Sequence, residues 1–425
     1  MPRAAALDLL DRVLHQRLLL DEAVLQSPSF AKLSERDRAL AQQITRTTLR
    51  HLGQINFLIS EFLDKPLGKK GKSAENVIRL GLAQLLFLDI PDHAAIDTSV
   101  ELCKGGQLSP YRKLVNAILR RTQREGREIL TELDAAALNT PHWLWTNWVS
   151  SYGEETARAI AEQHLIEAPL DLTVKTDPAT WTERLDGTLM PTGSVRLPKH
   201  KGTITKLEGF DDGAWWVQDM AASIPARLLG NVSGMDVIDL CAAPGGKTME
   251  LAASGANVTA VDRSEKRLKR VRDNLERTNL SAELITADAA QWRPKVLADA
   301  LLLDAPCSAT GTARRHPDVL HLKQEQDVEK LANLQSRLLQ AATDMVRPGG
   351  LIVYCTCSLQ RSEGEAQIEA VLNSNLPVEL APITPAEAGT LTQSVTEAGY
   401  LRTLPHYLSE QGGMDGFFAA RLRRT

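Results

Sequence analysis

The chain has 425 residues, which exceeds one ordinary domain and predicts two or three. Its hydrophobic share of 43% and charged share of 24% are typical of a globular protein with large cores, and the net charge of −4 excludes an overall basic surface. No apolar stretch reaches about 18 residues, and five cysteines without zinc-ligand spacing predict neither a disulfide framework nor a metal site, so we expect a cytoplasmic protein.

The first part of the chain is predicted to be all-helical over residues 1–138. Apolar residues between Leu7 and Leu14 keep helical spacing, and Ser34-Glu-Arg-Asp37 is a capping box. Ser109-Pro110 then predicts the start of a helix that carries basic residues. These are Arg112, Lys113, Arg120 and Arg121. They form either a solvated helix face or a surface that contacts phosphates.

Asn139-Thr-Pro141 marks a predicted boundary. Residues 170–210 show short strands that are interrupted by turn pairs at Asp177-Pro178, Asp186-Gly187 and Lys201-Gly202. This pattern predicts a small α+β linking module over residues 139–212. The remainder, residues 213–425, alternates apolar strands with helices and predicts a doubly wound α/β domain.

A cofactor loop is predicted at Asp239-Leu-Cys-Ala-Ala-Pro-Gly-Gly-Lys-Thr248. An apolar run precedes it, and small residues with a glycine pair predict the order strand, tight loop, helix. Bare backbone at Gly245 and Gly246 lets N–H groups approach a ligand beside the helix N-terminus. The loop is not a P-loop, because Cys241 stands where the first glycine of that motif belongs. The G-x-G-x-x-G dinucleotide fingerprint is also absent.

Four acids end four successive predicted strands: Asp239, Asp262, Asp288 and Asp304. Any one of them could be a helix cap or a turn residue. Ligands of open α/β sheets bind at the carboxyl ends of strands, so the set of four favours a nucleotide-type cofactor. In such folds the second acid commonly accepts hydrogen bonds from ribose hydroxyls, and the third can read an adenine amino group.

The set resembles the S-adenosylmethionine-dependent methyltransferases, whose fold is Rossmann-like. The resemblance implies S-adenosyl-L-methionine as the cofactor. The residues expected to hold it are Cys241, Ala242, Ala243, Pro244, Gly245, Gly246, Lys247, Asp262, Asp288 and Asp304.

Two cysteines narrow the expected chemistry. Asp304-Ala-Pro-Cys307-Ser follows the fourth strand, and Cys355-Thr-Cys357-Ser follows the fifth. Carbon 5 of a pyrimidine becomes nucleophilic only after a thiolate adds to carbon 6, so a cysteine beside the cofactor suits methylation there. The sequence spacing alone leaves open which cysteine attacks.

The paired motifs closely resemble those of the RNA cytosine-C5 methyltransferases. The resemblance implies that Cys357 is the nucleophile, that Cys307 promotes loss of the proton from carbon 5, and that Asp304 holds cytosine N3. Cys103, Cys241 and Cys355 are interpreted as buried, unreactive thiols. A nucleophilic Cys357 would need surroundings that favour its thiolate.

Two further segments carry the resemblance to one branch of that family. Val-Asn-Ala-Ile-Leu-Arg, ending at Arg120, resembles a helix of the NusB antitermination factor, and Arg314-Arg315-His316-Pro-Asp318 resembles a loop of the ribosomal RNA enzymes. The chain therefore resembles the RsmB (Sun/Fmu) family of bacterial 16S ribosomal RNA cytosine-C5 methyltransferases. The resemblance implies 16S ribosomal RNA as the partner, and Arg314 and Arg315 are added to the expected RNA contacts. We expect a monomer. A transfer RNA enzyme and a non-catalytic RNA-binding assembly factor remain as alternatives.

Overall fold

The computed structural model describes residues 1–197 and 202–425, and the chain divides into two compact units. The first unit holds Met1–Ile166 together with Ala313–Gln324, and the second holds Glu167–Thr312 and Glu325–Thr425. This division differs from the three predicted domains, because the helices after residue 138 pack with the first unit and the small sheet belongs to the second. Of the predicted turn at Lys201-Gly202, Lys201 lies outside the described residues.

The first unit is helical, as the sequence predicts. Ser34 caps α4, where its hydroxyl accepts a hydrogen bond from the N–H of Asp37 (3.3 Å). The predicted cap at Ser109 is wrong: residues Gly106–Tyr111 form a 3₁₀ turn, and α8 begins at Arg112. The α-helices before residue 167 are α1 (Pro2–Leu14), α2 (Leu20–Gln26), α3 (Pro28–Ala31), α4 (Glu35–Arg50), α5 (Leu52–Phe62), α6 (Lys72–Phe87), α7 (Asp92–Glu101), α8 (Arg112–Arg121), α9 (Arg127–Thr131), α10 (Ala135–Asn139), α11 (His142–Tyr152) and α12 (Glu154–His164).

The segment Ala313–Gln324, which carries α17 (Asp318–Leu322), is part of this helical unit although it comes much later in the chain. The Asp318 carboxylate accepts a hydrogen bond from the N–H of Leu20 (2.9 Å) at the start of α2. His321 contacts the carbonyl oxygen of Leu49 (2.8 Å), and Leu322 is buried in the core formed by α1 and α4. The segment is therefore fixed by polar and apolar contacts at once.

The second unit begins with a four-stranded antiparallel sheet in the order β2-β3-β1-β4, which matches the predicted small α+β module. The Asp171 carboxylate on β1 makes a two-pronged ion pair with Arg196 on β3, with both N···O distances 2.7 Å. Both side chains are fully buried. The elements are β1 (Leu170–Val174), α13 (Pro178–Arg184), β2 (Thr188–Leu189), β3 (Val195–Leu197) and β4 (Trp215–Val217).

The larger sheet of this unit has eight strands in the order β10-β12-β9-β8-β5-β6-β7, with β11 paired to β12. Strands β5 to β9 run parallel to one another, and β10 to β12 add an antiparallel edge. The strands are β5 (Asp236–Leu240), β6 (Asn257–Asp262), β7 (Glu283–Thr286), β8 (Ala298–Asp304), β9 (Val346–Thr356), β10 (Val378–Leu380), β11 (Leu401–Thr403) and β12 (Phe417–Arg424).

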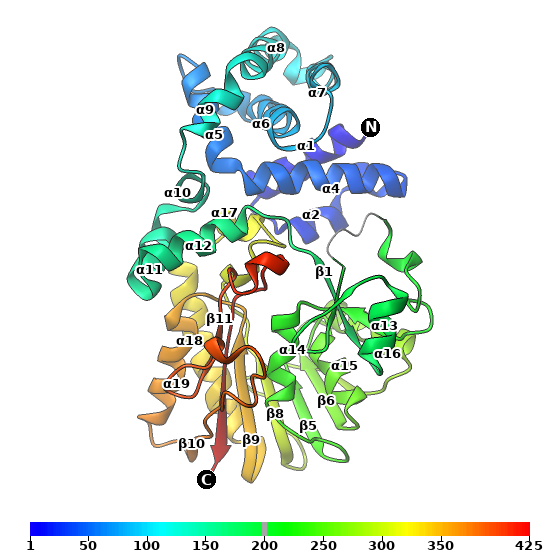
Figure 1. Cartoon of the computed structure of the whole chain (residues 1–425), viewed down its shortest axis with the longest axis vertical. Helices are drawn as coiled ribbons and strands as arrows, with labels where there is room; N and C mark the ends of the chain where they lie inside the picture. The colour runs from blue at the N-terminus through cyan, green and yellow to red at the C-terminus, as the bar shows by residue number, and fades with distance from the viewer. Residues whose placement is uncertain (198–201) are drawn as a thin grey trace. The chain divides into compact units, whose positions relative to one another are not determined.

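Helices cover both faces of this sheet, which explains why its strands are nearly continuous apolar runs (Figure 1). Alternate residues of β9 face opposite cores: Val353 packs with α14 and α15, and Ile352 packs with α18 and α19. The helices are α14 (Met220–Arg227), α15 (Gly246–Ala253), α16 (Glu265–Thr278), α18 (Glu325–Thr343) and α19 (Glu365–Leu372).

The parallel register brings the carboxyl ends of the central strands to one edge. Asp304 at the end of β8 lies opposite Cys355 on β9, and Leu240 of β5 lies opposite Leu303. The β9 strand also holds Pro348-Gly349-Gly350, which form a bulge between the pairs made by Val346 and Leu351. The segments that follow β5, β8 and β9 therefore meet at this edge.

Candidate active site

The predicted cofactor loop connects β5 to α15. Its backbone is unusual at two points: Cys241 has a φ of +62° and Gly245 has a φ of +105°, and the Ala243–Pro244 peptide bond between them is cis. A side chain at Gly245 would meet Val271 at 3.0 Å, so glycine is required by both the conformation and the space. The loop then enters α15 at Gly246, which places the helix N-terminus beside it.

Two of the predicted cofactor acids accept hydrogen bonds from backbone N–H groups, and one of them does so from the predicted cofactor loop. Asp262, at the end of β6, is buried and accepts hydrogen bonds from the N–H groups of Ala243 (3.3 Å) and Ser264 (2.9 Å). Asp288, after β7, is exposed and accepts a bond from the N–H of Ala290 (3.0 Å). Asp262 thus braces the cofactor loop directly, whereas Asp288 forms a local turn.

Asp239 lies at the centre of a buried acidic cluster. Its Oδ2 accepts a hydrogen bond from the hydroxyl of Thr248 (2.5 Å), and its Oδ1 is buried without a hydrogen-bond partner among the described residues. The pKa of this carboxyl is raised to about 7, mainly by burial and to a smaller extent by the charges of Asp304 and Asp262. Burial and the same three acids raise the pKa of the Cys241 thiol to about 12. This negative potential suits a ligand that carries positive charge.

Lys247 supplies a buried cation at this edge. Its ammonium lies 2.8 Å from Oδ2 of Asp304 and 5.1 Å from the centre of the Phe417 ring. Burial alone would lower the pKa of Lys247, but the charge and hydrogen bond of Asp304, together with the charges of Cys355 and Cys357, outweigh this effect, so the pKa is raised. The other oxygen of Asp304 accepts a weak bond from the Cys355 thiol (3.5 Å). The structure therefore pairs Asp304 with Lys247, which the sequence analysis assigned only to the cofactor.

The two cysteines of the paired motifs meet at the same edge. The sulfur atoms of Cys307 and Cys357 lie 3.4 Å apart, and both residues are partly accessible. One main-chain bond joins their two loops, and a second joins the Cys307 loop to the segment before β12. The N–H of Gly311 donates to the carbonyl of Cys357 (3.0 Å), and the N–H of Gly416 donates to the carbonyl of Gly311 (2.8 Å). A Cβ at Gly311 would lie 1.9 Å from the Gly416 oxygen, so this approach requires glycine.

Two thiols near this edge, those of Cys307 and Cys355, have raised pKa values. The pKa of Cys307 is raised well above its usual value, first by the hydrogen bond with Cys357 and then by burial. Cys355 is fully buried, and burial together with the Asp304 charge raises its pKa well above the usual value. Cys355 is therefore held as a neutral thiol.

The predicted RNA contacts fall into two groups. Arg112, Lys113, Arg120 and Arg121 are exposed on and beside one face of α8, where Arg121 also pairs with Glu125 (2.8 Å). The side chain of Arg314 is fully buried, so it does not present a guanidinium to a nucleic acid, and its assignment as an RNA contact is wrong for this structure. Arg315 is partly accessible.

Sequence reasoning missed a buried polar cluster behind the two thiols. It consists of Ser308, Ser358, Glu363 and Gln335, all buried. The only signal in the sequence is that a serine directly follows each cysteine of the pair. Glu363 and Gln335 lie outside both cysteine motifs, and no sequence pattern links them to the two serines.

Comparisons with known proteins identify the family. A family model described as NusB matches residues 1–124, and one described as 16S rRNA methyltransferase RsmB/F matches residues 226–423. Ribosomal RNA small subunit methyltransferase B of Escherichia coli O127:H6 is 36% identical over 99% of this chain and 98% of that protein. The chain belongs to the RsmB family of methyltransferases.

Solved structures agree with this membership at the level of the fold. A crystal structure of PH0851 covers 100% of this chain and 99% of its own, with a TM-score of 0.77 and 21% identity. A methyltransferase homologue from Pyrococcus horikoshii covers 66% of this chain and 94% of its own, with a TM-score of 0.55 and 27% identity. The RsmB-family chain described here thus has an all-helical NusB-type domain and a Rossmann-like methyltransferase domain, as the sequence predicts. Within the described ranges, no helix is long and apolar enough to cross a membrane, and no group of His, Cys, Asp and Glu side chains is arranged to hold a metal ion.

Proposed function

We propose that this protein methylates carbon 5 of a cytosine in 16S ribosomal RNA, with S-adenosyl-L-methionine as the methyl donor. The observation that carries the proposal is the pair of thiols, Cys307 and Cys357, 3.4 Å apart at the carboxyl ends of β8 and β9. A second thiol beside the nucleophile supports a mechanism in which one thiol forms a covalent adduct and the other helps to resolve it. The 36% identity to a ribosomal RNA small subunit methyltransferase over nearly the whole chain supports the substrate class.

The residues present fit the proposed cofactor. S-adenosylmethionine supplies an electrophilic methyl group on a positively charged sulfonium and also carries an ammonium group. The buried acids Asp239 and Asp262 give the site the opposite charge, and Oδ1 of Asp239 still lacks a hydrogen-bond partner among the described residues. The proposed contacts are the backbone from Cys241 to Lys247 and the carboxylates of Asp262, Asp288 and Asp304.

The chain's own residues would then act in a defined order. The Cys357 thiolate adds to carbon 6 of an unstacked cytosine, which makes carbon 5 nucleophilic. As the adduct forms, N3 takes up a proton that balances the one lost by the Cys357 thiol, and Asp304, held by Lys247, accepts a hydrogen bond from the N3–H that results. Once carbon 5 bears its new methyl group, Cys307 takes the proton from that carbon, and the Cys357–carbon 6 bond breaks. The raised pKa keeps Cys307 as a thiol at rest, so it must first release its own proton to water; its thiolate is then a strong base for the proton on carbon 5.

The exposed basic residues of α8 are proposed to bind the RNA backbone. Arg112, Lys113, Arg120 and Arg121 lie within three turns of one helix and would contact phosphates without reading sequence. Arg315 is kept as a further candidate, whereas Arg314 is not.

The proposal is tested with methyl-labelled S-adenosylmethionine and two separate substrates, deproteinised 16S ribosomal RNA and transfer RNA, followed by nucleoside analysis. Labelled 5-methylcytidine from 16S ribosomal RNA alone is the expected result. Label in transfer RNA would keep the chemistry and change the substrate. Label at another nucleoside position would refute the role of the thiol pair. Bound cofactor without label in either RNA or in ribosomal particles would favour a non-catalytic assembly factor.

A further inference from the structure

A buried carboxylate lies behind the two thiols and belongs to neither cysteine motif. Glu363 ends a short 3₁₀ turn (Arg361–Glu363) that follows the Cys357 loop, and its side chain is fully buried. Burying a carboxylate is costly unless several donors replace the lost water, so each such group calls for a physical explanation. Here the donors that surround it come from both cysteine loops.

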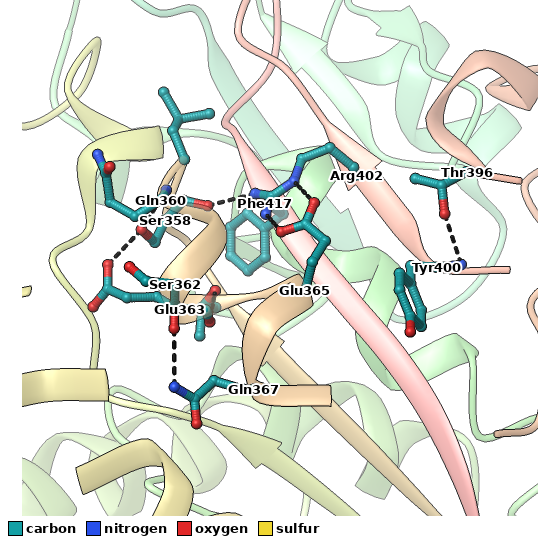
Figure 2. A network of polar contacts seen from close by, with 12 residues as sticks. Ser358, Gln360, Ser362, Glu363, Glu365, Gln367, Thr396, Tyr400, Arg402 and Phe417 are labelled. Atoms are coloured by element: carbon teal, nitrogen blue, oxygen red, sulfur yellow. Dashed lines mark hydrogen bonds and ion pairs between the residues drawn. The ribbon is translucent and has the colours of Figure 1, made fainter. Parts of the chain in front are cut away.

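The carboxylate bridges the residues that directly follow the two cysteines. Its Oε2 accepts hydrogen bonds from the hydroxyls of Ser308 and Ser358, both at 2.5 Å, and these hydroxyls are 3.1 Å from each other. Its Oε1 accepts from the N–H of Ser308 (2.9 Å). Figure 2 shows Glu363 and Ser358 facing each other with this bond drawn between them. One side chain therefore fixes the backbone next to Cys307 and next to Cys357 at the same time.

A third element joins the bridge from α18. The amide of Gln335 donates both to Oε1 of Glu363 (3.1 Å) and to the carbonyl of Pro306 (2.8 Å), the residue before Cys307. The Cys307 segment is thus held on both sides, at Pro306 and at Ser308, by groups that meet at the Glu363 carboxylate.

The fold-supporting bonds of Glu363 use its main chain instead. Its carbonyl oxygen accepts hydrogen bonds from the hydroxyls of Tyr354 (2.8 Å) and Thr356 (3.2 Å), both on β9. A substitution of the side chain leaves this carbonyl in place. The carboxylate and the carbonyl of Glu363 therefore have separable roles. Of these two groups, the carboxylate contacts both cysteine loops, and the carbonyl contacts β9.

An ion pair between Arg402 and Glu365 also supports the Cys357 loop, through the carbonyl of Ser358. Arg402 donates to the Ser358 carbonyl (2.6 Å) and pairs with Glu365 (2.7 Å), as Figure 2 shows. Ser358 is thus held through its hydroxyl by Glu363 and through its carbonyl by Arg402. This second anchor holds the Cys357 loop when the Glu363 carboxylate is removed. The links to the Cys307 segment that pass through the carboxylate are then lost, whereas the bonds from Gly311 N–H to the Cys357 carbonyl (3.0 Å) and from Leu359 N–H to the Thr310 hydroxyl (3.0 Å) remain.

We propose that Glu363 is a positioning residue that sets the distance between the two thiols, acting through Ser308 and Ser358. The inference rests on the proposed function, in which Cys357 forms the adduct and Cys307 resolves it. Both steps require each thiol to reach a different carbon of one base, and a displacement of about 1 Å at a reacting group can cost about a hundredfold in rate.

The electrostatics of the site agree with this role. Glu363 adds to the rise in the pKa of Cys307, after the hydrogen bond with Cys357 and burial. The carboxylate therefore favours the uncharged thiol form of Cys307 before the reaction.

The first experiment measures the thiol geometry without RNA or cofactor. Wild type, Glu363→Ala and Glu363→Gln are equilibrated with mixtures of oxidised and reduced glutathione, and the fraction with a Cys307–Cys357 disulfide is read by mass spectrometry. In this reaction two protein thiols are oxidised to one disulfide, and one oxidised glutathione is reduced to two thiols. We expect Glu363→Ala to lower the equilibrium constant about tenfold or more. Glu363→Gln should stay within about threefold, because its carboxamide can still accept from the Ser308 N–H and donate to both hydroxyls.

The second experiment measures turnover with the RNA substrate. We expect Glu363→Ala to lower kcat about a hundredfold with KM for RNA within about threefold, and Glu363→Gln to recover most of the loss. The double variant Ser308→Ala/Ser358→Ala should reproduce the effect, and adding Glu363→Ala to it should change little further. Ile368→Ala, in the buried core of the adjoining α19, is the matched control, because it destabilises the same segment without touching the bridge.

The outcomes separate this inference from the proposed function. An unchanged thiol equilibrium in Glu363→Ala, or an equal loss in Ile368→Ala, would overturn the positioning role even if the enzyme methylates cytosine. A tenfold loss of thiol coupling in an enzyme that methylates no cytosine would support the bridge and refute the function. If Glu363→Ala does not fold, the serine double variant decides, since it removes both hydroxyls and keeps the buried carboxylate.

Discussion

Replacing Asp239 with asparagine should remove a pH dependence that the buried carboxyl imposes on the methyltransferase unit. The pKa of Asp239 is raised from 3.8 to about 7, because burial disfavours its charged form. Between about pH 4 and pH 7 the folded chain therefore binds a proton that the unfolded chain has released. Stability falls as pH rises wherever the folded state binds more protons, so this carboxyl destabilises the fold progressively across that window.

The magnitude follows from the size of the shift. A rise of about three pKa units corresponds to about 4 kcal/mol, at 1.36 kcal/mol per unit. Asparagine can accept the same hydrogen bond from Thr248 and never ionises, so the variant should match wild type only at or below about pH 4, where Asp239 is protonated in both states. Near pH 8 it should be more stable by several kcal/mol.

Urea unfolding of both proteins at half-unit pH steps measures this difference directly, because other titrating groups cancel between wild type and variant. Glu250, whose pKa burial raises to about 7, stays in both and serves as an internal reference. Parallel stability curves from pH 5 to pH 8 would refute the assignment of a raised pKa to Asp239. A variant that gains stability and loses cofactor affinity would show that the acid is retained for binding.

Three further outcomes are expected. Cys307→Ala should accumulate a covalent RNA–protein adduct, seen as a slow, nuclease-sensitive band in denaturing gels, with turnover at least a hundredfold lower; absence of the band would contradict its role in release. Lys247→Met removes the cation that lies 2.8 Å from the Asp304 carboxylate, and should lower the rate constant of methyl transfer about tenfold or more in single-turnover assays. An unchanged rate constant would show that Asp304 needs no such partner. Arg112→Glu/Lys113→Glu should weaken RNA binding and reduce the slope of log affinity against log salt by about 2, measured by filter binding; an unchanged slope would move the phosphate contacts elsewhere.

The parts of the site that lie on consecutive residues could be predicted from the sequence. The strand–loop–helix order around Gly245 follows from local chemistry, and the carboxyl ends of parallel strands must meet, so Asp304, Cys307 and Cys357 were expected at one edge. The third acid, Asp288, follows the same pattern, yet the structure gives its carboxylate a local turn contact.

Other features depend on contacts between distant segments and could not be predicted. Two adjacent arginines after Cys307 have the composition of a phosphate-binding loop, but packing of the segment against the first helices buries Arg314. Glu363 has no motif of its own, because its task appears only when the two serine-containing loops and α18 fold together. The domain boundary at residue 138 was placed by Asn139-Thr-Pro141, whereas helix packing continues to Ile166.

The segment Ala313–Gln324 prevents either unit from being expressed whole as one continuous fragment. The chain passes between the units at residues 166–167, 312–313 and 324–325, so neither half is a continuous piece of sequence. A fragment ending at Ile166 lacks the Asp318 carboxylate that accepts from Leu20 and the Leu322 side chain of its core. A fragment starting at Glu167 carries the segment without the α1 and α4 core in which Leu322 is buried. Expression of either unit as one continuous fragment therefore separates residues that belong to one compact unit.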